Sequence, residues 1–322
     1  MNVAMISRWH VHADEYTRIL QAADGVTITA VYHEDEASGK EWADKVGCKF
    51  VANLDDIIND KSIDAVAVNS ATNLHPEIII AAANAGKHVF TEKVLALHNN
   101  EAEAIKAAII KAGKTFVISF PHLVRPELLK AKEIMESGKL GKVSYARVRN
   151  VHSGASANWL PPHFYNEEQC GGGAMIDLGA HPMYTLAWLL GDPLTVQSTF
   201  TEVMGKGVED NAVSVLTFAN GAIGVSETGF LSTGNPYTVE ISGTDGALMI
   251  HDGLSYCGTD TDKQWVDVTD LPEAAPLPCA QFAKIAQENG QIEEFGIEKA
   301  VRLTKIMDAA YRSKLSGAAE KV

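Results

Sequence analysis

The first 120 residues alternate short apolar runs with segments whose apolar residues are spaced as on a helix. The apolar runs, rich in Val, Ile and Ala, predict strands at residues 3–6, 26–32, 63–70, 87–93 and 115–120. Apolar positions three or four apart predict the intervening helices at residues 14–23, 37–47, 76–86 and 100–113. Strands separated by helices of this length form parallel βαβ units, so this part is predicted to be a doubly wound parallel sheet of the α/β class.

From residue 143 onward the pattern changes to strand-like alternation. Five segments predict mainly antiparallel strands, at residues 143–152, 194–204, 211–230, 237–252 and 263–268. Asn-Gly at 220–221 and Asp-Gly at 245–246 predict hairpin turns, and helical spacing returns at residues 183–191 and 298–313. We therefore expect two domains: residues 1–120, and residues 121–322 as an α+β domain with an open, mainly antiparallel sheet.

Composition narrows the class of protein. A chain of 322 residues exceeds one compact core, and its net charge of −14 argues against nucleic acid, whose phosphates need clustered Lys and Arg. No apolar run approaches the ~18 residues that cross a bilayer, and no signal-peptide pattern opens the chain. The four cysteines are scattered without a C-x-x-C pair. We expect a cytoplasmic protein without a membrane partner, whose open sheet is covered by pairing into a homodimer or homotetramer.

Three residues far apart in the sequence offer acid–base chemistry. Lys93 follows a predicted strand, at the carboxyl end where doubly wound sheets bind ligands. Asp177 and His181 follow three glycines and lie four apart, on one face if the segment is helical; Pro182 means that the helix kinks or begins near His181. Taken one at a time, these residues also have ordinary structural interpretations: Lys93 as a solvated lysine, Asp177 as a carboxylate at a helix start, and His181 as a capping or core histidine. Together, in a groove between two domains, they fit proton removal by His181 while Lys93 donates to a substrate oxygen.

Two further histidines, His10 and His12, alternate directly after the first predicted strand. Alternating histidines occur in metal sites, but two histidines without a clear third ligand are weak evidence for one. The sequence therefore predicts no metal site.

Four stretches carry a joint signature: residues 62–96, which include "TEKVLA"; residues 136–148; "CGGGAMIDLGAHPMYTLAWLLG" at 170–191; and residues 296–317. In this order they resemble the glucose-fructose oxidoreductase, inositol dehydrogenase and rhizopine-catabolism (Gfo/Idh/MocA) family. The first is similar to its βαβ crossing with a Glu-Lys-Pro motif, although Val94 replaces the proline, and the third to its G-G-G-x-x-x-D-x-G-x-H helix. The resemblance implies a Rossmann-type domain, a substrate domain, a bound nicotinamide dinucleotide, and oxidation or reduction of a sugar or polyol.

The resemblance also implies residue roles. Lys93 would be the catalytic lysine, Asp177 would orient substrate and lysine, and His181 would be the acid/base. The residues lining the nicotinamide side of the cofactor would be Ser70, Thr72, Asn73, His75 and Glu92. The candidate substrate contacts are His122, Trp159, His163 and Tyr165.

The nucleotide loop departs from the usual fingerprint. The three glycine positions of G-x-G-x-x-G are occupied by Ser7, Trp9 and His12. "HVHA" at 10–13 looks like a His-x-His-Ala version of this turn that some family members carry. In that version Arg8 and His10 would supply phosphate contacts beside the helix N-terminus.

The end of the second predicted strand bears on the choice of dinucleotide. His33 stands where an acidic residue commonly binds the ribose hydroxyls of NAD, and Glu34 and Asp35 follow it directly. No Arg lies close by in the sequence to receive a 2′-phosphate. We predict NAD as the cofactor, with NADP as the alternative.

Three hypotheses of function follow. The leading one is hydride transfer between NAD(P) and a carbohydrate or polyol, favoured because Lys93, Asp177 and His181 occur together. The second is a redox elimination, in which bound NAD oxidises a sugar transiently and a glycosidic bond breaks. The third is a sugar-binding or regulatory protein whose dinucleotide loop is degenerate, supported by the missing glycines.

Overall fold

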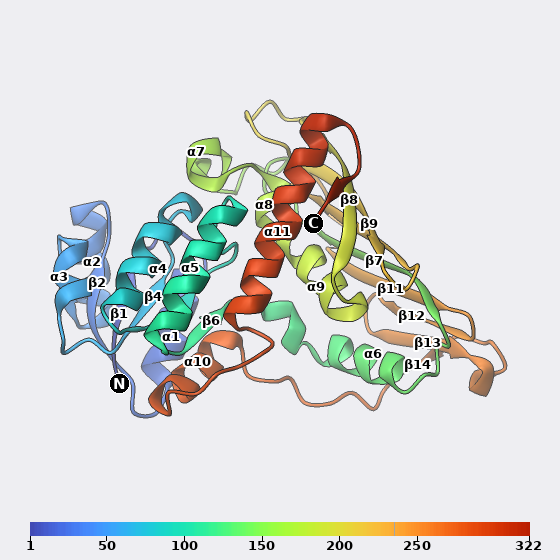
Figure 1. Cartoon of the computed structure of the whole chain (residues 1–322), viewed down its shortest axis with the longest axis horizontal. Helices are drawn as coiled ribbons and strands as arrows, with labels where there is room; N and C mark the ends of the chain where they lie inside the picture. Colours follow the sequence, from blue (N-terminus) through green and yellow to red (C-terminus); the bar gives the residue numbers. More distant parts are fainter. Residues whose placement is uncertain (235) are drawn as a thin grey trace. The chain divides into compact units, whose positions relative to one another are not determined.

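The computed structural model describes residues 1–234 and 236–322, which divide into two compact units (Figure 1). The first unit comprises residues 1–120 and 276–304, and the second comprises residues 121–275 and 305–322. Residues 276–304, which follow the second unit's main sheet in sequence, therefore return to the first unit. Among the described residues, no helix combines the length and the apolar character needed to cross a membrane.

The first unit contains a six-stranded, all-parallel sheet with the order β3-β2-β1-β4-β5-β6. Its strands are β1 (Asn2–Ile6), β2 (Thr27–Tyr32), β3 (Lys49–Phe50), β4 (Ala65–Val68), β5 (His88–Thr91) and β6 (Phe116–Ile118). This is the strand order of a Rossmann fold, with the direction of winding reversing between β1 and β4. The predicted doubly wound α/β sheet is confirmed.

The helices of the first unit are α1 (Ala13–Ala22), α2 (Glu36–Val46), α3 (Leu54–Asn59), α4 (His75–Asn84), α5 (Asn99–Ala112) and α10 (Pro278–Gln287), with a 3₁₀ turn at Thr72–Leu74. Four of them, α1, α2, α4 and α5, were predicted from the sequence, and α3 and α10 were not. β4 is buried along its whole length, which explains why its sequence is a continuous apolar run rather than an alternation. The periodic pattern did not reveal β3 and α3, because two and six residues are too few to show a period.

The second unit contains an open, nine-stranded, mixed sheet with the order β14-β13-β12-β11-β7-β10-β9-β8-β15. Its strands are β7 (Val143–Val151), β8 (Pro193–Thr201), β9 (Asn211–Phe218), β10 (Ile223–Gly229), β11 (Tyr237–Gly243), β12 (Gly246–Ile250), β13 (Leu254–Gly258), β14 (Val266–Asp267) and β15 (Glu320–Lys321). Among the strand pairings of the described residues, that of β7 with β10 is parallel and the others are antiparallel. The predicted open, mainly antiparallel sheet is confirmed.

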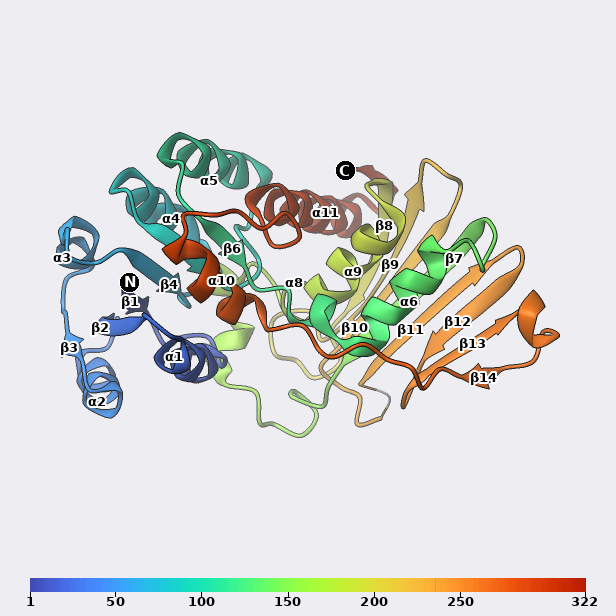
Figure 2. The same ribbon diagram turned by 90° about the horizontal axis from the view of Figure 1, so that it is seen from below.

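Helices cover one face of this sheet (Figure 2). They include α6 (Pro126–Glu136), α8 (Ala174–Asp177) and α9 (Ala180–Leu190), and the unit also holds α7 (Glu167–Cys170) and the latter part of α11 (Ile297–Ser316). α9 packs on β7 and β10, while α8 packs on β9 and β10. Asp177 ends α8 and His181 lies in the first turn of α9, so one continuous helix does not carry both. The alternative that the second helix begins near His181 is the one the structure adopts.

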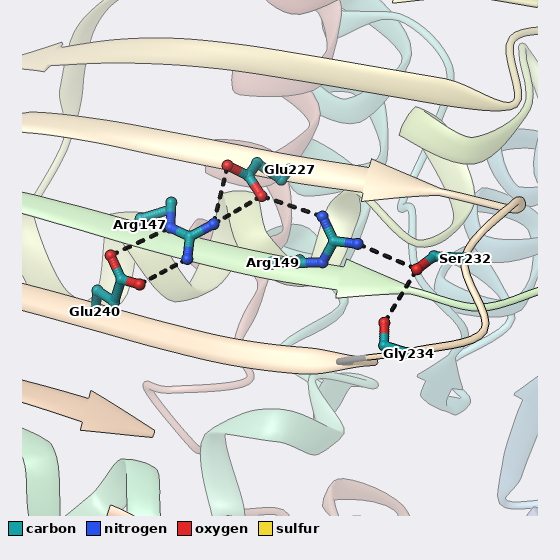
Figure 3. Close-up of polar contacts among 6 residues, drawn as sticks. All are labelled: Arg147, Arg149, Glu227, Ser232, Gly234 and Glu240. Carbon is teal, nitrogen blue, oxygen red and sulfur yellow. Dashed lines mark hydrogen bonds and ion pairs between the residues drawn. The ribbon is translucent and has the colours of Figure 1, made fainter. Parts of the chain in front are cut away.

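The opposite face of the sheet carries apolar and charged side chains together. Arg147 on β7 pairs with Glu240 on the neighbouring β11 (Nη2 to Oε1, 2.6 Å) and with Glu227 on β10 (Nη1 to Oε2, 3.0 Å), as Figure 3 shows. Arg149 also approaches Glu227, at 3.4 Å. These charges flank three exposed apolar residues of β9 and β10: Val213, Val215 and Ile223.

Candidate active site

The loop of residues 7–12 connects β1 to α1 at the carboxyl ends of the parallel strands. Ser7 has φ 65°, in the left-handed region that favours glycine, and it occupies the first position of the glycine fingerprint. Its N–H donates to the carbonyl of Tyr32 (2.8 Å) at the end of β2, and the N–H of His10 donates to the carbonyl of Asn69 (3.0 Å) after β4. The loop is thus fastened to both strands that neighbour β1, at the point where this fold binds ligands.

The side chains of this loop are already engaged within the unit. Arg8 Nε donates to Asp14 Oδ1 in the first turn of α1 (2.6 Å), and this hydrogen bond raises the pKa of Arg8. Trp9 is half-buried, with its ring 6.4 Å from that of His10. His12 precedes α1 but its side chain makes no capping hydrogen bond. The N-terminus of α1 is therefore not capped by the residue that precedes it, which suits an anionic ligand.

The end of β2 places Glu34 beside the loop, and His33 Nδ1 lies 3.7 Å from the Glu34 oxygen that faces Ser7. Glu34 Oε2 accepts a hydrogen bond from Ser7 Oγ (2.7 Å). His33 Nδ1 accepts from the N–H of Asp35 (2.9 Å), and Asp35 in turn caps α2 by accepting from Ser38 (2.8 Å). Of the acidic pair that follows β2, only Glu34 is directed toward the fingerprint loop.

The segment after β4 contains buried polar atoms without a hydrogen-bond partner among the described residues. They are Asn69 Oδ1, Ser70 Oγ and Asn73 Oδ1, and Thr72 in the same segment is also buried. Leaving such atoms unpaired costs free energy, and a bound polar ligand is one way to satisfy them. Together with Ser7 in the glycine conformation, this segment fits a dinucleotide.

His75 holds this segment against the residues after β5. Its Nδ1 lies 2.9 Å from the carbonyl of Val94 and its Nε2 lies 3.1 Å from the carbonyl of Ser70. His75 is fully buried, and this burial lowers its pKa despite the two carbonyl oxygens. The neutral imidazole carries one ring N–H, so it donates to one of these two carbonyl oxygens at a time while lying next to the backbone of both Ser70 and Val94.

The buried His75 makes the first unit sensitive to acid. A histidine whose folded pKa lies below its ordinary value of 6.5 takes up its proton more readily in the unfolded chain, so stability is lost as the pH falls below about 6.5. We expect the free energy of unfolding, measured in urea, to decrease between pH 7 and pH 5. His75→Gln is expected to lower stability at pH 7 but to show a smaller decrease on acidification. An unchanged pH dependence in this variant would contradict the assignment.

Glu92 and Lys93 follow β5 directly, and both are buried, with 2% and 6% of their surfaces exposed. Glu92 Oε2 accepts from the N–H of Lys93 (2.8 Å), and its carboxylate accepts from the Tyr16 hydroxyl, which also lies 2.8 Å from Ser119 Oγ. Burial opposes the charge on Glu92, but the nearby His10 and Lys93 outweigh it and keep the pKa of Glu92 below its ordinary value. The strand end therefore presents a fixed carboxylate beside a buried lysine.

In the second unit, Glu209 anchors the glycine-rich segment before α8. Its Oε1 accepts from the N–H of Gly173 (2.9 Å), the N–H of Met175 (3.0 Å) and the Tyr311 hydroxyl (2.7 Å). A Cβ on Gly173 would lie 2.1 Å from the Glu209 carbonyl oxygen, and Gly172 has φ 157°. The glycines therefore allow the backbone to approach Glu209 closely, and Glu209 sets where α8 begins.

His181 lies in a buried cluster of rings. Its Nδ1 is 2.8 Å from the Tyr184 hydroxyl, and that hydroxyl also accepts from the N–H of His122 (3.2 Å). The ring of His122 stacks on that of His181 with centroids 4.3 Å apart, and Tyr237 meets His122 edge-on at 4.6 Å. The structure thus brings the substrate candidate His122 to the acid/base candidate, whose Nδ1 faces Tyr184.

The other substrate candidates, Trp159, His163 and Tyr165, lie in the segment of the sequence that connects β7 to α8. His152 contacts Trp159, with ring centroids 4.6 Å apart, and stacks on Phe230 at 4.9 Å. Tyr165 meets Phe230 edge-on at 6.3 Å, whereas the ring of His163 pairs with its neighbour Phe164. Trp159 is 54% exposed. Trp159 and Tyr165 therefore belong to one group of aromatic rings, which His152 and Phe230 connect. The sequence analysis did not single out these two connecting residues.

Several residues of these sites carried no sequence signal of their own. They are Tyr16, Asn69, Ser119, Tyr184, Glu209 and Tyr311. Tyr16 contacts Glu92 and Asn69 contacts His10, each from a distant element, so the fold is what connects them to the predicted residues. Tyr184 is the exception, because it follows His181 by three residues on one helix, a spacing that places two side chains side by side.

Comparison with known proteins agrees with this architecture. Residues 2–120 match the oxidoreductase family with an NAD-binding Rossmann fold, and residues 128–249 match the GFO/IDH/MocA C-terminal domain. The chain belongs to the Gfo/Idh/MocA oxidoreductase family. It is therefore an oxidoreductase that uses a nicotinamide dinucleotide, NAD or NADP, as the sequence analysis predicted.

Relatives of this Gfo/Idh/MocA member are similar over most of their length. The chain is 29% identical to 1,5-anhydro-D-fructose reductase of Ensifer adhaerens over 236 residues, 70% of this chain and 69% of that protein. It is 28% identical to myo-inositol 2-dehydrogenase of Thermotoga maritima over 264 residues, 79% and 75% of the two chains. Levoglucosan dehydrogenase, solved with NADH and levoglucosan, shares the fold with a TM-score of 0.88 and 22% identity, covering 100% of this chain and 99% of that one.

Proposed function

We propose that this oxidoreductase transfers hydride between NAD and a hydroxyl or carbonyl carbon of a sugar, polyol or related small molecule. The observation that carries the proposal is the buried Glu92–Lys93 pair at the end of β5 in a Rossmann unit whose loop retains the glycine conformation at Ser7. The substrate class is supported by the relatives, since two of them are named as an anhydrofructose reductase and an inositol dehydrogenase. The fold is shared with a levoglucosan dehydrogenase solved with its sugar.

The cofactor would be held by residues of the first unit alone. The phosphate side would contact Ser7, Arg8, Trp9, His10 and His12, with Arg8 exchanging its bond to Asp14 for a phosphate. The nicotinamide side would contact Ser70, Thr72, Asn73, His75 and Glu92. Of these, Ser70 Oγ and Asn73 Oδ1 are buried without a hydrogen-bond partner among the described residues, and a bound cofactor would supply one. When bound, the nicotinamide ring accepts or gives the hydride, a redox capacity that side chains lack.

The catalytic roles fall to Lys93, Asp177 and His181. Lys93 would donate a hydrogen bond to the reacting oxygen and stabilise the negative charge that develops there. His181 would take or give the hydroxyl proton through Nε2, because its Nδ1 faces Tyr184. Asp177 would orient the substrate and the lysine. We assign substrate contacts to His122, Trp159, His163 and Tyr165.

Product analysis tests this function against its alternatives. Incubating the protein with NAD and a panel of sugars and polyols is expected to release NADH and the oxidised sugar in equal amounts. Release of an aglycone from a glycoside without net NADH would instead indicate redox elimination. Failure to bind NAD or NADH, measured by calorimetry, would overturn both and leave a sugar-binding protein. Trp9→Gly is included in the titration, because unchanged affinity would place this residue away from the phosphates.

Glu34 is expected to favour NAD over NADP. Its carboxylate lies beside Ser7 at the end of β2, where acidic residues bind ribose hydroxyls and repel a 2′-phosphate. We expect Glu34→Gln to weaken NAD binding about tenfold, equivalent to roughly 1.4 kcal/mol, and to weaken NADP binding less. Glu36→Gln, which removes an exposed charge two residues away, is the matched control and is expected to leave both affinities unchanged. Equal effects on the two dinucleotides would contradict this role.

We propose that the helix-free face of the nine-stranded sheet joins copies of the chain into a homodimer or homotetramer. Exposed Val213, Val215 and Ile223 support this assignment, since such apolar residues gather where surfaces associate. Val215→Arg is expected to convert the oligomer into monomers in light scattering. Ile110→Arg, a comparable exposed change on α5, should leave the size unaltered.

We also propose a cytoplasmic location. All four cysteines are free thiols, which suits the reducing conditions of the cytoplasm.

A further inference from the structure

His10, His12 and Glu92 bring three metal-binding donor groups together in the first unit. One ligand atom from each residue lies within 4.8 Å of the others. The two histidines come from the loop before α1 and the glutamate from the end of β5. The sequence contained the two histidines without a clear third ligand, and the fold supplies that ligand from a distant strand.

The donor set selects a particular kind of ion. Two imidazoles and one carboxylate are the ligands of many zinc and iron(II) sites, and three protein ligands leave room for water. Mg²⁺ and Ca²⁺ prefer all-oxygen surroundings and are disfavoured here. We propose that His10, His12 and Glu92 form a binding site for a divalent transition-metal ion, with Zn²⁺ as its probe.

The two buried ligands are held in place by contacts beyond the cluster. Glu92 accepts hydrogen bonds from the Tyr16 hydroxyl and from the N–H of Lys93, and Tyr16 is in turn 2.8 Å from Ser119 Oγ. The backbone of His10 is tied to Asn69 on its N–H side. Outer contacts of this kind orient metal ligands and raise affinity for the ion.

The third ligand is positioned to admit the ion. The His12 side chain is 47% exposed, whereas those of His10 and Glu92 are 6% and 2% exposed. A tetrahedral ion with bonds of about 2.1 Å holds its ligand atoms about 3.4 Å apart. The buried pair, His10 Nδ1 and Glu92 Oε1, is already 3.6 Å apart, although His10 Nδ1 also accepts from the N–H of His12 (3.3 Å), a contact that the ion would replace. The exposed His12 can close the remaining distance by a side-chain rotation away from Glu15, whose Oε2 lies 3.5 Å from its Nδ1.

Metal titration of the full chain tests the site. Chelator-treated protein, without nucleotide or substrate, is titrated with Zn²⁺ by calorimetry and expected to bind about one ion per chain, far more tightly than Mg²⁺. His12→Ala and Glu92→Gln are each expected to weaken Zn²⁺ binding at least about tenfold, and Tyr16→Phe about tenfold through the outer contact. His98→Ala is the matched control, because His98 is also exposed and also precedes a helix, and it should bind as wild type does.

Two results would overturn the proposal. One is the absence of saturable Zn²⁺ binding, which would leave His10 and Glu92 as neighbouring side chains only. The other is equal binding by wild type and His12→Ala, whose exposed position makes misfolding an inadequate explanation. The proposed function assigns the same three residues to the dinucleotide, so Zn²⁺ binding is measured without nucleotide and NAD binding without metal. Loss of one affinity is thereby distinguished from loss of the other.

Discussion

Replacing Lys93 by Met is expected to lower kcat about 10³-fold in the hydride-transfer assay, the range for loss of a group that stabilises charge or moves a proton. Met keeps much of the length and apolar body of the lysine stem but cannot donate to a substrate oxygen. Lys93 is 6% exposed and its N–H donates to the fixed Glu92 carboxylate, so its backbone position is set by the end of β5. The measurement is steady-state kinetics with the substrate identified by product analysis.

The control separates catalysis from folding and cofactor binding. NADH affinity of Lys93→Met is expected to stay within about threefold of wild type, because only the transition state should lose the interaction. Lys40→Met removes an exposed lysine that pairs with Glu36 and is expected to leave kcat unchanged. A Lys93→Met enzyme with near wild-type kcat would remove Lys93 from the catalytic residues.

Glu209→Ala is expected to produce the largest loss of stability, about 3–5 kcal/mol in the free energy of unfolding, because several buried donors lose their acceptor at once. Oε1 accepts from two backbone N–H groups of the glycine-rich segment and from the Tyr311 hydroxyl. These donors begin α8, whose last residue is Asp177, so activity is expected to fall together with stability. Urea denaturation followed by circular dichroism gives the free energy.

Glu209→Gln provides the graded comparison. Its amide oxygen can still accept from the same donors but carries no charge, so we expect about half the loss of the alanine variant. Glu202→Ala is a suitable control because Glu202 lies in the same connection between β8 and β9. It is exposed, and its carboxylate also accepts a hydrogen bond from a backbone N–H, that of Gly207. A change below about 1 kcal/mol in Glu209→Ala would show that this cluster does not anchor the segment.

Sequence patterns were sufficient for the fold class because most of the longer elements have their own local signal, whereas β3 and α3 are too short to show one. Continuous Val and Ala runs marked the strands of the first unit, and alternation marked β8 and β9, whose buried and exposed residues alternate as predicted. The junction of α8 and α9 shows the limit of local rules. Spacing alone suggested one helical face for Asp177 and His181, whereas the chain breaks between them at Leu178 and Gly179.

The sequence by itself determined the α/β and α+β classes, the family signature and the positions of the residues proposed for catalysis, because periodicity and short motifs are local properties. The tertiary structure alone decided which distant groups meet. It placed Glu92 beside His10 and His12, Glu209 against the backbone of Gly173 in the triple glycine, and Glu34 beside Ser7. Such contacts depend on strand order and loop conformation, which bring together residues that no local pattern connects.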